Sequence, residues 1–143
     1  MPHHAEPRAL PLRALLEAHE GRRAFPYPDT AGKLTIGVGR NLTDRGLSED
    51  EIDLLLANDI AIAAEACAEI FGPGFTGFAA PRRHALMSMA FNLGAPRLAG
   101  FRRMRAAIGV SDWDAAAAEA LDSRWAAQTG RRAPEIASLL RGG

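Results

Sequence analysis

The sequence predicts a mainly helical α+β fold, because one strand pattern near the N-terminus is followed by helical patterns over most of the chain. Residues 34–39 alternate apolar side chains with Thr and Gly, which indicates a short β-strand. A helical pattern then runs over residues 48–71, and a helix of that length, roughly 30–35 Å, can link two lobes of a small domain. The chain has 143 residues, enough for one domain with a real core.

The N-terminal segment predicts a leader followed by one helix. Residues 1–9 lack the apolar run of a secretory signal, so we expect no signal peptide there. Leucines at helical spacing predict a helix over residues 10–20. Glu20 lies at the edge of the apolar face of this helix, and Gly21 is a residue type that ends helices.

The segment after the first helix predicts a turn, a strand and a loop. Pro26 and Pro28 make the segment after Gly21 rich in turn formers, and residues 29–32, Asp-Thr-Ala-Gly, predict a turn before the strand. In the strand, Leu34 is expected on an apolar face, and Thr35 and Gly37 on the opposite face, which consists of Thr and Gly. Residues 41–46 are expected to form a loop.

The remaining sequence predicts the long helix and then a group of shorter ones. Ser48 and Glu51 have the spacing of a capping box that begins the long helix, and residues 72–74, Gly-Pro-Gly, end it. Ser111 is expected to cap a later helix. The shorter helices are expected over residues 81–93, 98–108, 112–121, 123–129 and 133–140. The residues expected in the core include Cys67, Met89, Phe91, Phe101 and Trp125.

Charge is divided unevenly along a chain whose net charge is zero. Residues 1–71 carry seven basic and twelve acidic side chains, whereas residues 72–143 carry ten and five, and all ten basic residues there are Arg. The excess of Arg in residues 72–143 suits binding to an anionic partner. The alternative is an ordinary solvated surface of mixed charge, which would have the same composition. No apolar run reaches the ~20 residues that cross a bilayer, and no nucleic-acid motif is present. We therefore expect no stable membrane insertion, no nucleic-acid binding and no cofactor or metal.

Glu20, Asp29 and Thr35 form a pattern that suits cleavage of a glycosidic bond. This reaction needs an acid for the leaving oxygen, and a nucleophile or a base-held water on the other side of the sugar. The apolar helix face and the helix C-terminus both favour the protonated form of Glu20. Asp29 in its polar turn is expected to be ionised and, together with the Thr35 hydroxyl, to hold one water. We expect inversion, with the two carboxyl groups about 6.5–9.5 Å apart.

The same residues resemble the signature of the phage-type lysozymes, the endolysins of glycoside hydrolase family 24. That signature is a Glu, an Asp nine residues on, and a Thr six residues further in a Thr-Ile-Gly-hydrophobic-Gly strand. Here it reads Glu20, Asp29 and Thr35-Ile36-Gly37-Val38-Gly39. The resemblance covers roughly residues 10–141, and it includes residues 82–94, 98–101 and 123–129 of the helical part.

The resemblance implies a single lysozyme-like domain over residues 1–143. Within it, residues 10–20 form a first helix packed on the helical lobe, residues 21–47 a small lobe with a short antiparallel sheet, residues 48–71 the connecting helix and residues 72–143 the helical lobe. Arg40 stands where some members carry His, and the segment from Asn41 to Ser48 is shorter than in the longest members.

The resemblance also implies a function: cleavage of the β-1,4 bond between N-acetylmuramic acid and N-acetylglucosamine of peptidoglycan. Glu20 would be the general acid, and Asp29 and Thr35 would position water. Asn92 would lie in the cleft and Arg132 near Glu20. The protein would act as a monomer, made in the host cytoplasm and reaching the cell wall after holin-type release.

Two further residues are candidates for sugar binding. Tyr27 lies between two prolines close to the motif, where its ring can line a sugar subsite. Gly37 leaves room for a bulky sugar to approach the strand backbone.

Two other functions remain open at this point. A lytic transglycosylase cleaves the same bond without water and needs the acid but not the Asp-Thr pair, so it would release a 1,6-anhydro end. A catalytically inactive wall-binding module would release no product at all.

Overall fold

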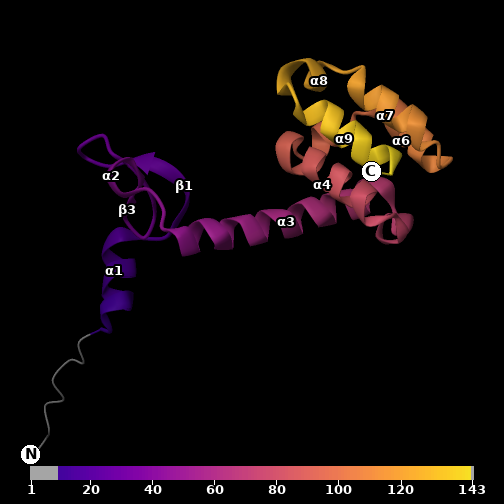
Figure 1. The fold of residues 1–143 in the computed structure, drawn as a ribbon. Coiled ribbons are helices and arrows are strands. Elements are labelled where there is room, and N and C mark those ends of the chain that lie inside the picture. The colour runs from indigo at the N-terminus through magenta and orange to yellow at the C-terminus, as the bar shows by residue number, and fades with distance from the viewer. Residues whose placement is uncertain (1–9, 143) are drawn as a thin grey trace, which may run out of the picture. The chain divides into compact units, whose positions relative to one another are not determined.

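The structure, a computed structural model, describes residues 10–142 (Figure 1). The leader expected over residues 1–9 lies outside the described residues. The described chain divides into two compact units between Ile52 and Asp53, and each unit is described here by itself. The first unit contains α1 (Leu12–Glu20), β1 (Arg23–Pro28), β2 (Leu34–Gly37), β3 (Arg40–Asn41), α2 (Leu42–Arg45) and the start of α3 (Glu49–Phe71).

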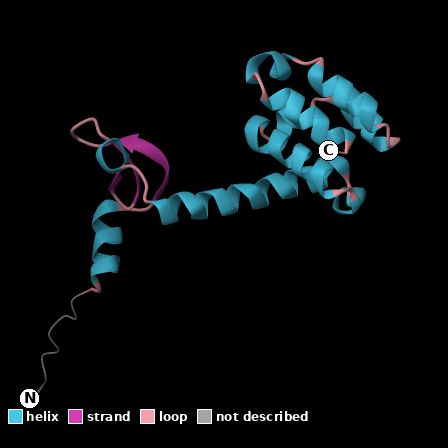
Figure 2. Ribbon diagram, viewed as in Figure 1, coloured by secondary structure: helices cyan, strands magenta, loops and turns pink. Residues whose placement is uncertain are grey.

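The sheet of the first unit has three antiparallel strands in the order β1-β2-β3, as Figure 2 shows in magenta. Thr35 on the central strand pairs with Tyr27 on one side and Asn41 on the other. The register of β1 against β2 shifts between Arg23 and Tyr27.

Residue patterns alone did not predict a strand at β1, since Pro26 and Pro28 make the segment rich in turn formers. The position of β1 at the edge of the sheet explains why prolines are tolerated there. The turn predicted at residues 29–32 is confirmed, because Gly32 N donates to Asp29 O at 3.0 Å.

Burial along β2 does not follow the polarity of its residues. Leu34 is 46% exposed, whereas Thr35 is 5% exposed and is the one buried polar residue among those described. The apolar face and the Thr-Gly face predicted for this strand therefore do not correspond to a covered face and an open one. An alternating pattern shows that a strand has two different faces, but it cannot show which face of a small sheet is covered.

The links on either side of α2 are short and hydrogen-bonded. α2 occupies part of the expected loop, and the side chain of Asn41 caps it by accepting from Asp44 N at 2.9 Å. The capping box before α3 is confirmed: Glu51 N donates to Ser48 Oγ at 3.3 Å, and Ser48 N donates to Glu51 Oε1 at 2.9 Å. α3 then runs to Phe71, as expected.

The second unit is helical. After the rest of α3 it contains a 3-10 turn, η1 (Pro73–Gly77), and the helices α4 (Ala80–Leu93), α5 (Ala95–Ala99), α6 (Arg102–Gly109), α7 (Trp113–Leu121), α8 (Arg124–Thr129) and α9 (Arg132–Arg141). α9 packs against both α4 and α7, and α6 packs against α7 (Figure 1). The fully buried side chains of this second unit include Cys67, Leu86, Met89, Leu98, Met104 and Leu140. Burial raises the pKa of the Cys67 thiol to about 11, which fits a packing role rather than a nucleophile.

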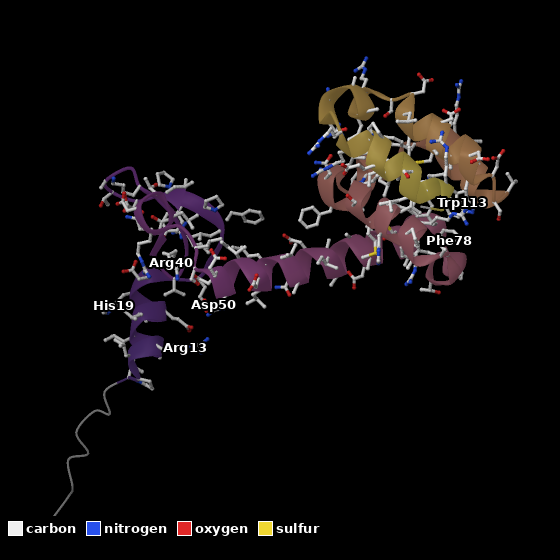
Figure 3. All side chains as sticks on the ribbon, viewed as in Figure 1. Arg13, His19, Arg40, Asp50, Phe78 and Trp113 are labelled. Carbon is white, nitrogen blue, oxygen red and sulfur yellow. The ribbon has the colours of Figure 1, made fainter. Side chains whose placement is uncertain are left out.

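Three details of the helical unit differ from expectation. The helix expected over residues 98–108 is divided into α5 and α6, because the chain turns at Gly100 between them. Asp112, not Ser111, caps α7 by accepting from Ala115 N at 3.0 Å. Phe91, expected in the core, is 52% exposed. Trp125 is buried as expected, and Phe78 packs edge-on against Trp113 with ring centroids 4.9 Å apart (Figure 3).

None of the helices described for residues 10–142 is both long and apolar enough to cross a membrane. α1 belongs to the first unit, and its packing on the helical lobe stays a prediction.

Candidate active site

Asp29 organises the turn between β1 and β2. Its Oδ1 atom accepts from the backbone N–H groups of Ala31 and Lys33, both at 2.8 Å. The backbone closes the same turn, since Asp29 N donates to Lys33 O at 2.9 Å. These contacts hold one oxygen of the carboxylate in place and leave Oδ2 without a hydrogen bond to a described residue. Asp29 is exposed, so this second oxygen faces solvent.

Thr35 is joined to Asp29 through the backbone of Lys33. The Thr35 hydroxyl donates to Lys33 O at 3.0 Å, and Lys33 N donates to Asp29 Oδ1 at 2.8 Å. The single hydroxyl proton of Thr35 is used in this contact, so its oxygen remains available only as an acceptor. The structure thus brings together two of the three residues that the motif predicts for the reaction.

Glu20 ends α1, and its carboxyl group lies against the end of the motif strand. A β-carbon at Gly39 would lie 3.0 Å from Glu20 Oε2 and 3.1 Å from its Cδ. Gly39 also has φ of +74°, a conformation that side chains disfavour. The motif therefore needs Gly39 for the approach of Glu20, and no local sequence pattern indicates this role. Glu20 is itself exposed within its unit.

Tyr27 pairs with Thr35 from the neighbouring strand β1, and Gly37 lies two residues after Thr35 on β2 itself. Tyr27 is half-buried, and the guanidinium carbon of Arg23 lies 4.5 Å from its ring centroid. Gly37 pairs with Arg23 across the sheet, and a β-carbon there would meet nothing within 4 Å. The open space at Gly37 is compatible with the approach of a sugar, and the Tyr27 ring has one face covered by Arg23.

An ion pair at Arg40, whose partner the sequence did not indicate, joins the end of the sheet to the beginning of α3. Arg40 (labelled in Figure 3) donates from Nη1 to Glu51 Oε1 at 2.7 Å and to Gly46 O at 3.1 Å. Hydrogen bonds from Arg40 and Ser48 lower the pKa of Glu51 to about 2, and the same contact raises the pKa of Arg40. The capping box predicted Glu51 as a helix cap, but no local pattern indicated its partner eleven residues earlier.

Asn92 and Arg132 belong to the helical unit, so their relation to Glu20 stays a prediction. Asn92 is exposed at the end of α4, and its Oδ1 accepts from Trp125 Nε1 at 2.8 Å. An indole N–H can only donate, so the amide oxygen of Asn92 is the atom that faces Trp125. The NH2 group of Asn92 therefore points away from Trp125 and can donate hydrogen bonds. Arg132 begins α9 and, with Phe91 and other residues, lines a largely apolar pocket of about 450 Å³.

The comparisons with known proteins agree with this fold and motif. A family model described as Phage lysozyme matches residues 17–141. Probable T4-type lysozyme 2 of Dictyostelium discoideum is 24% identical over an alignment of 160 residues, which covers 92% of this chain and 94% of that protein. The pre-baseplate central spike protein Gp5 of Enterobacteria phage T4 is 26% identical over 156 residues, which cover 90% of this chain and 27% of that protein.

A mainly helical fold with a short N-terminal antiparallel sheet and these matches define the chain as a glycoside hydrolase. It belongs to the phage lysozyme family, and membership of that family implies hydrolysis of peptidoglycan.

Proposed function

We propose that this protein is a muramidase that cleaves the β-1,4 bond between N-acetylmuramic acid and N-acetylglucosamine by direct attack of water. The observation that carries the proposal is the hydrogen-bonded turn in which the backbone of Lys33 joins Asp29 to Thr35. The carboxyl group of Glu20 lies against Gly39, the last residue of the same sequence motif. Glu20 is the general acid, and it protonates the glycosidic oxygen as the bond to the anomeric carbon breaks.

The hydrogen bonds of the turn determine how a water would be held. Thr35 has already donated its proton to Lys33, so it accepts from the water rather than donating to it. Asp29 Oδ2 accepts the second proton of the same water. With both protons directed toward protein oxygens, a lone pair of the water is free to attack the anomeric carbon. Asp29 then takes the proton that the water loses, and one net displacement inverts the configuration.

The remaining candidates would bind substrate rather than react with it. The half-buried ring of Tyr27 offers one face to a sugar, and the open space at Gly37 admits the sugar to the strand backbone. Asn92 presents its amide N–H groups as donors, because Trp125 holds the amide oxygen. Arg132 supplies a positive charge from the helical unit. These four roles come from the family resemblance and local geometry together.

The biological setting is part of the same proposal. The enzyme acts as a monomer in bacterial lysis, is made in the host cytoplasm and reaches the wall after holin-type release. Family membership supports this setting, since peptidoglycan is the substrate that it implies.

Mass spectrometry of digested peptidoglycan tests the proposed reaction. The parent protein should release fragments that end in reducing N-acetylmuramic acid. Glu20→Gln should keep the fold, seen as an unchanged circular dichroism spectrum, and should lose at least about 99% of the activity, because an amide cannot donate the proton. Fragments with 1,6-anhydro ends would instead identify a lytic transglycosylase, and a parent protein that releases no fragments would be a wall-binding module.

A further inference from the structure

The arginines of the helical unit differ in whether their guanidinium groups are used by the fold. Arg82 donates from Nε to Leu140 O at 2.9 Å, and its guanidinium carbon lies 4.6 Å from the Trp113 ring centroid. Arg105 donates to two backbone carbonyl groups, at 2.9 and 3.2 Å. Such contacts link separate helices and satisfy carbonyl groups at their ends. These arginines stabilise the unit, and their charges are not free for a ligand.

Four other arginines line a single pocket of about 500 Å³ within the helical unit. We call it the arginine pocket, and its arginines are Arg97, Arg102, Arg103 and Arg124. All four are exposed, and none forms an ion pair or a side-chain hydrogen bond with another residue in the range 10–142. Two carboxylates, Glu119 and Asp122, also line the pocket, so its lining carries an excess of two positive charges.

The N-terminus of α6 opens on the same pocket. Phe101, Arg102, Arg103 and Met104, the residues that begin α6, are all part of the lining. No side chain caps this helix end, and its first turn contains no acidic residue. The N–H of Arg102 donates to Gly100 O at 2.9 Å, so the later N–H groups of this first turn, together with the helix dipole, are the ones that attract an anion, as guanidinium groups do. Phe101 and Trp125, packed edge-on with centroids 6.4 Å apart, add an apolar wall.

We propose that the arginine pocket binds a phosphate group of a phosphodiester polymer of the bacterial wall. Guanidinium groups form their strongest, often paired, hydrogen bonds with oxyanions. The phosphate of a phosphodiester is tetrahedral, and its two charged, non-bridging oxygens are flanked by two ester oxygens. Each charged oxygen can accept from a different arginine or from an N–H group in the first turn of α6. A planar carboxylate offers two oxygens in one plane and suits a single guanidinium fork. The proposal rests on the proposed function, since the wall is where the enzyme would meet such a polymer.

Calorimetric titration with poly(glycerol phosphate) at physiological ionic strength, where the Debye length is about 8 Å, tests this site. The full chain carrying Glu20→Gln is used throughout, so that binding is measured without hydrolysis. The double variant Arg102→Gln/Arg103→Gln should bind the polymer about tenfold or more weakly, because it removes two charge-assisted contacts. The matched control is Arg45→Gln/Arg131→Gln, which removes the same charge from two exposed arginines outside the pocket. The control should bind within about twofold of the parent, since surface charge acts only through a screened field.

Several outcomes would overturn the proposal: no binding by the parent, an equal loss in both double variants, or equally tight binding of polyglutamate of the same charge. The first shows that there is no site, the second that only net charge matters, and the third that phosphate is not selected. If Arg102→Gln/Arg103→Gln fails to fold, Arg97→Gln/Arg124→Gln takes its place, since these two residues lie on other elements of the same pocket.

A second measurement separates this proposal from the proposed function. In this measurement the double variant Arg102→Gln/Arg103→Gln carries the native Glu20. It should digest walls stripped of phosphodiester polymer at the parent rate, and it should be slower than the parent only on walls that carry the polymer. Equal rates of the parent and the variant on both kinds of wall would contradict a role for the pocket. If no form of the protein digests any wall, the proposed function fails, while the titration still decides whether the pocket binds phosphate.

Discussion

At the residue scale, the fit between Glu20 and Gly39 is the most demanding contact of the site. The backbone of Gly39 has φ of +74°, and a β-carbon would come within 3.0 Å of a carboxyl oxygen of Glu20. Any side chain would therefore strain the backbone and also displace Glu20, the proposed general acid. Displacement matters because proton transfer requires the acid within hydrogen-bond reach of the glycosidic oxygen.

Gly39→Ala should lower activity by at least about tenfold, more than its loss of stability explains. The strain of an alanine at positive φ costs about 1–2 kcal/mol, whereas the shifted carboxyl group acts directly on the reaction. Steady-state rates on peptidoglycan, measured well below the unfolding temperature, are the readout. Gly46→Ala is the control, because Gly46 also has positive φ, +60°, but nothing lies within 4 Å of its added β-carbon.

Gly46→Ala should lose similar stability and keep its activity. If Gly39→Ala retained parental activity while folded, Gly39 would serve only the turn of the backbone, and the packing of Glu20 against it would have no catalytic role.

The positions of the motif residues were predictable only where the sequence signal is local. Asp29 lies in the predicted turn and Thr35 in the predicted strand, because both elements are defined by residues close together in the chain. The catalytic roles of the two residues stay predictions. The approach of Glu20 to Gly39 and the pairing of Arg40 with Glu51 were not, because each depends on how separate elements meet. Spacing along a chain gives no distance between side chains on different elements.

At the element scale, the contacts of Glu51 join β3 to the beginning of α3. Its carboxylate receives the Arg40 guanidinium, the Ser48 hydroxyl and the Ser48 backbone N–H, the first two at 2.7 and 2.8 Å. One acid thus caps the long helix and also holds the last strand of the sheet. Because these donors favour the charged carboxylate, the pKa of Glu51 is lowered from 4.5 to about 2.

The stabilisation from Glu51 should disappear on acidification. A group whose pKa is lowered by folding stabilises the fold fully above its ordinary pKa, here 4.5, and loses that contribution as the pH falls toward about 2. Glu51→Gln should therefore lower the thermal unfolding midpoint at pH 6, and the difference from the parent should shrink between about pH 5 and pH 2.

Glu49→Gln is the matched control for this pH series, because it removes an exposed carboxylate from the same helix turn. It should change the midpoint little at either pH. A difference between the parent and Glu51→Gln that stays constant from pH 6 to pH 2 would show that the ion pair does not supply the stability.

The elements themselves were predictable where capping and periodicity agree. α3 begins at its capping box, and β2 follows its alternating pattern. β1 was not read as a strand from its residues, because Pro26 and Pro28 are turn formers and only pairing with β2 makes the segment extended. The division of residues 98–108 into two helices was missed because their apolar spacing continues across the break at Gly100.

At the scale of the whole molecule, the uneven charge predicts a salt-sensitive enzyme. The positive half of the chain carries ten arginines, and wall polymers are anionic. The Debye length is about 8 Å at physiological ionic strength and becomes shorter as salt is added. Attraction between exposed charges therefore weakens as salt rises. The rate of wall digestion should fall steadily from low salt to ~0.3 M.

Digestion of small soluble peptidoglycan fragments provides the control for this prediction, since they do not require adsorption to a wall. Their rate should change little over the same range of salt. A rate on whole walls that is also independent of salt would show that the charge division has no part in binding.

The central claim is that water held by Asp29 and Thr35 attacks the sugar directly, and the anomeric form of the first product tests it. Proton NMR of freshly released reducing ends, recorded before the anomers exchange, distinguishes the α- from the β-form. A single displacement on a β-linked substrate predicts the α-anomer. An initial β-anomer would contradict the account, because it requires two displacements and would make Asp29 a nucleophile.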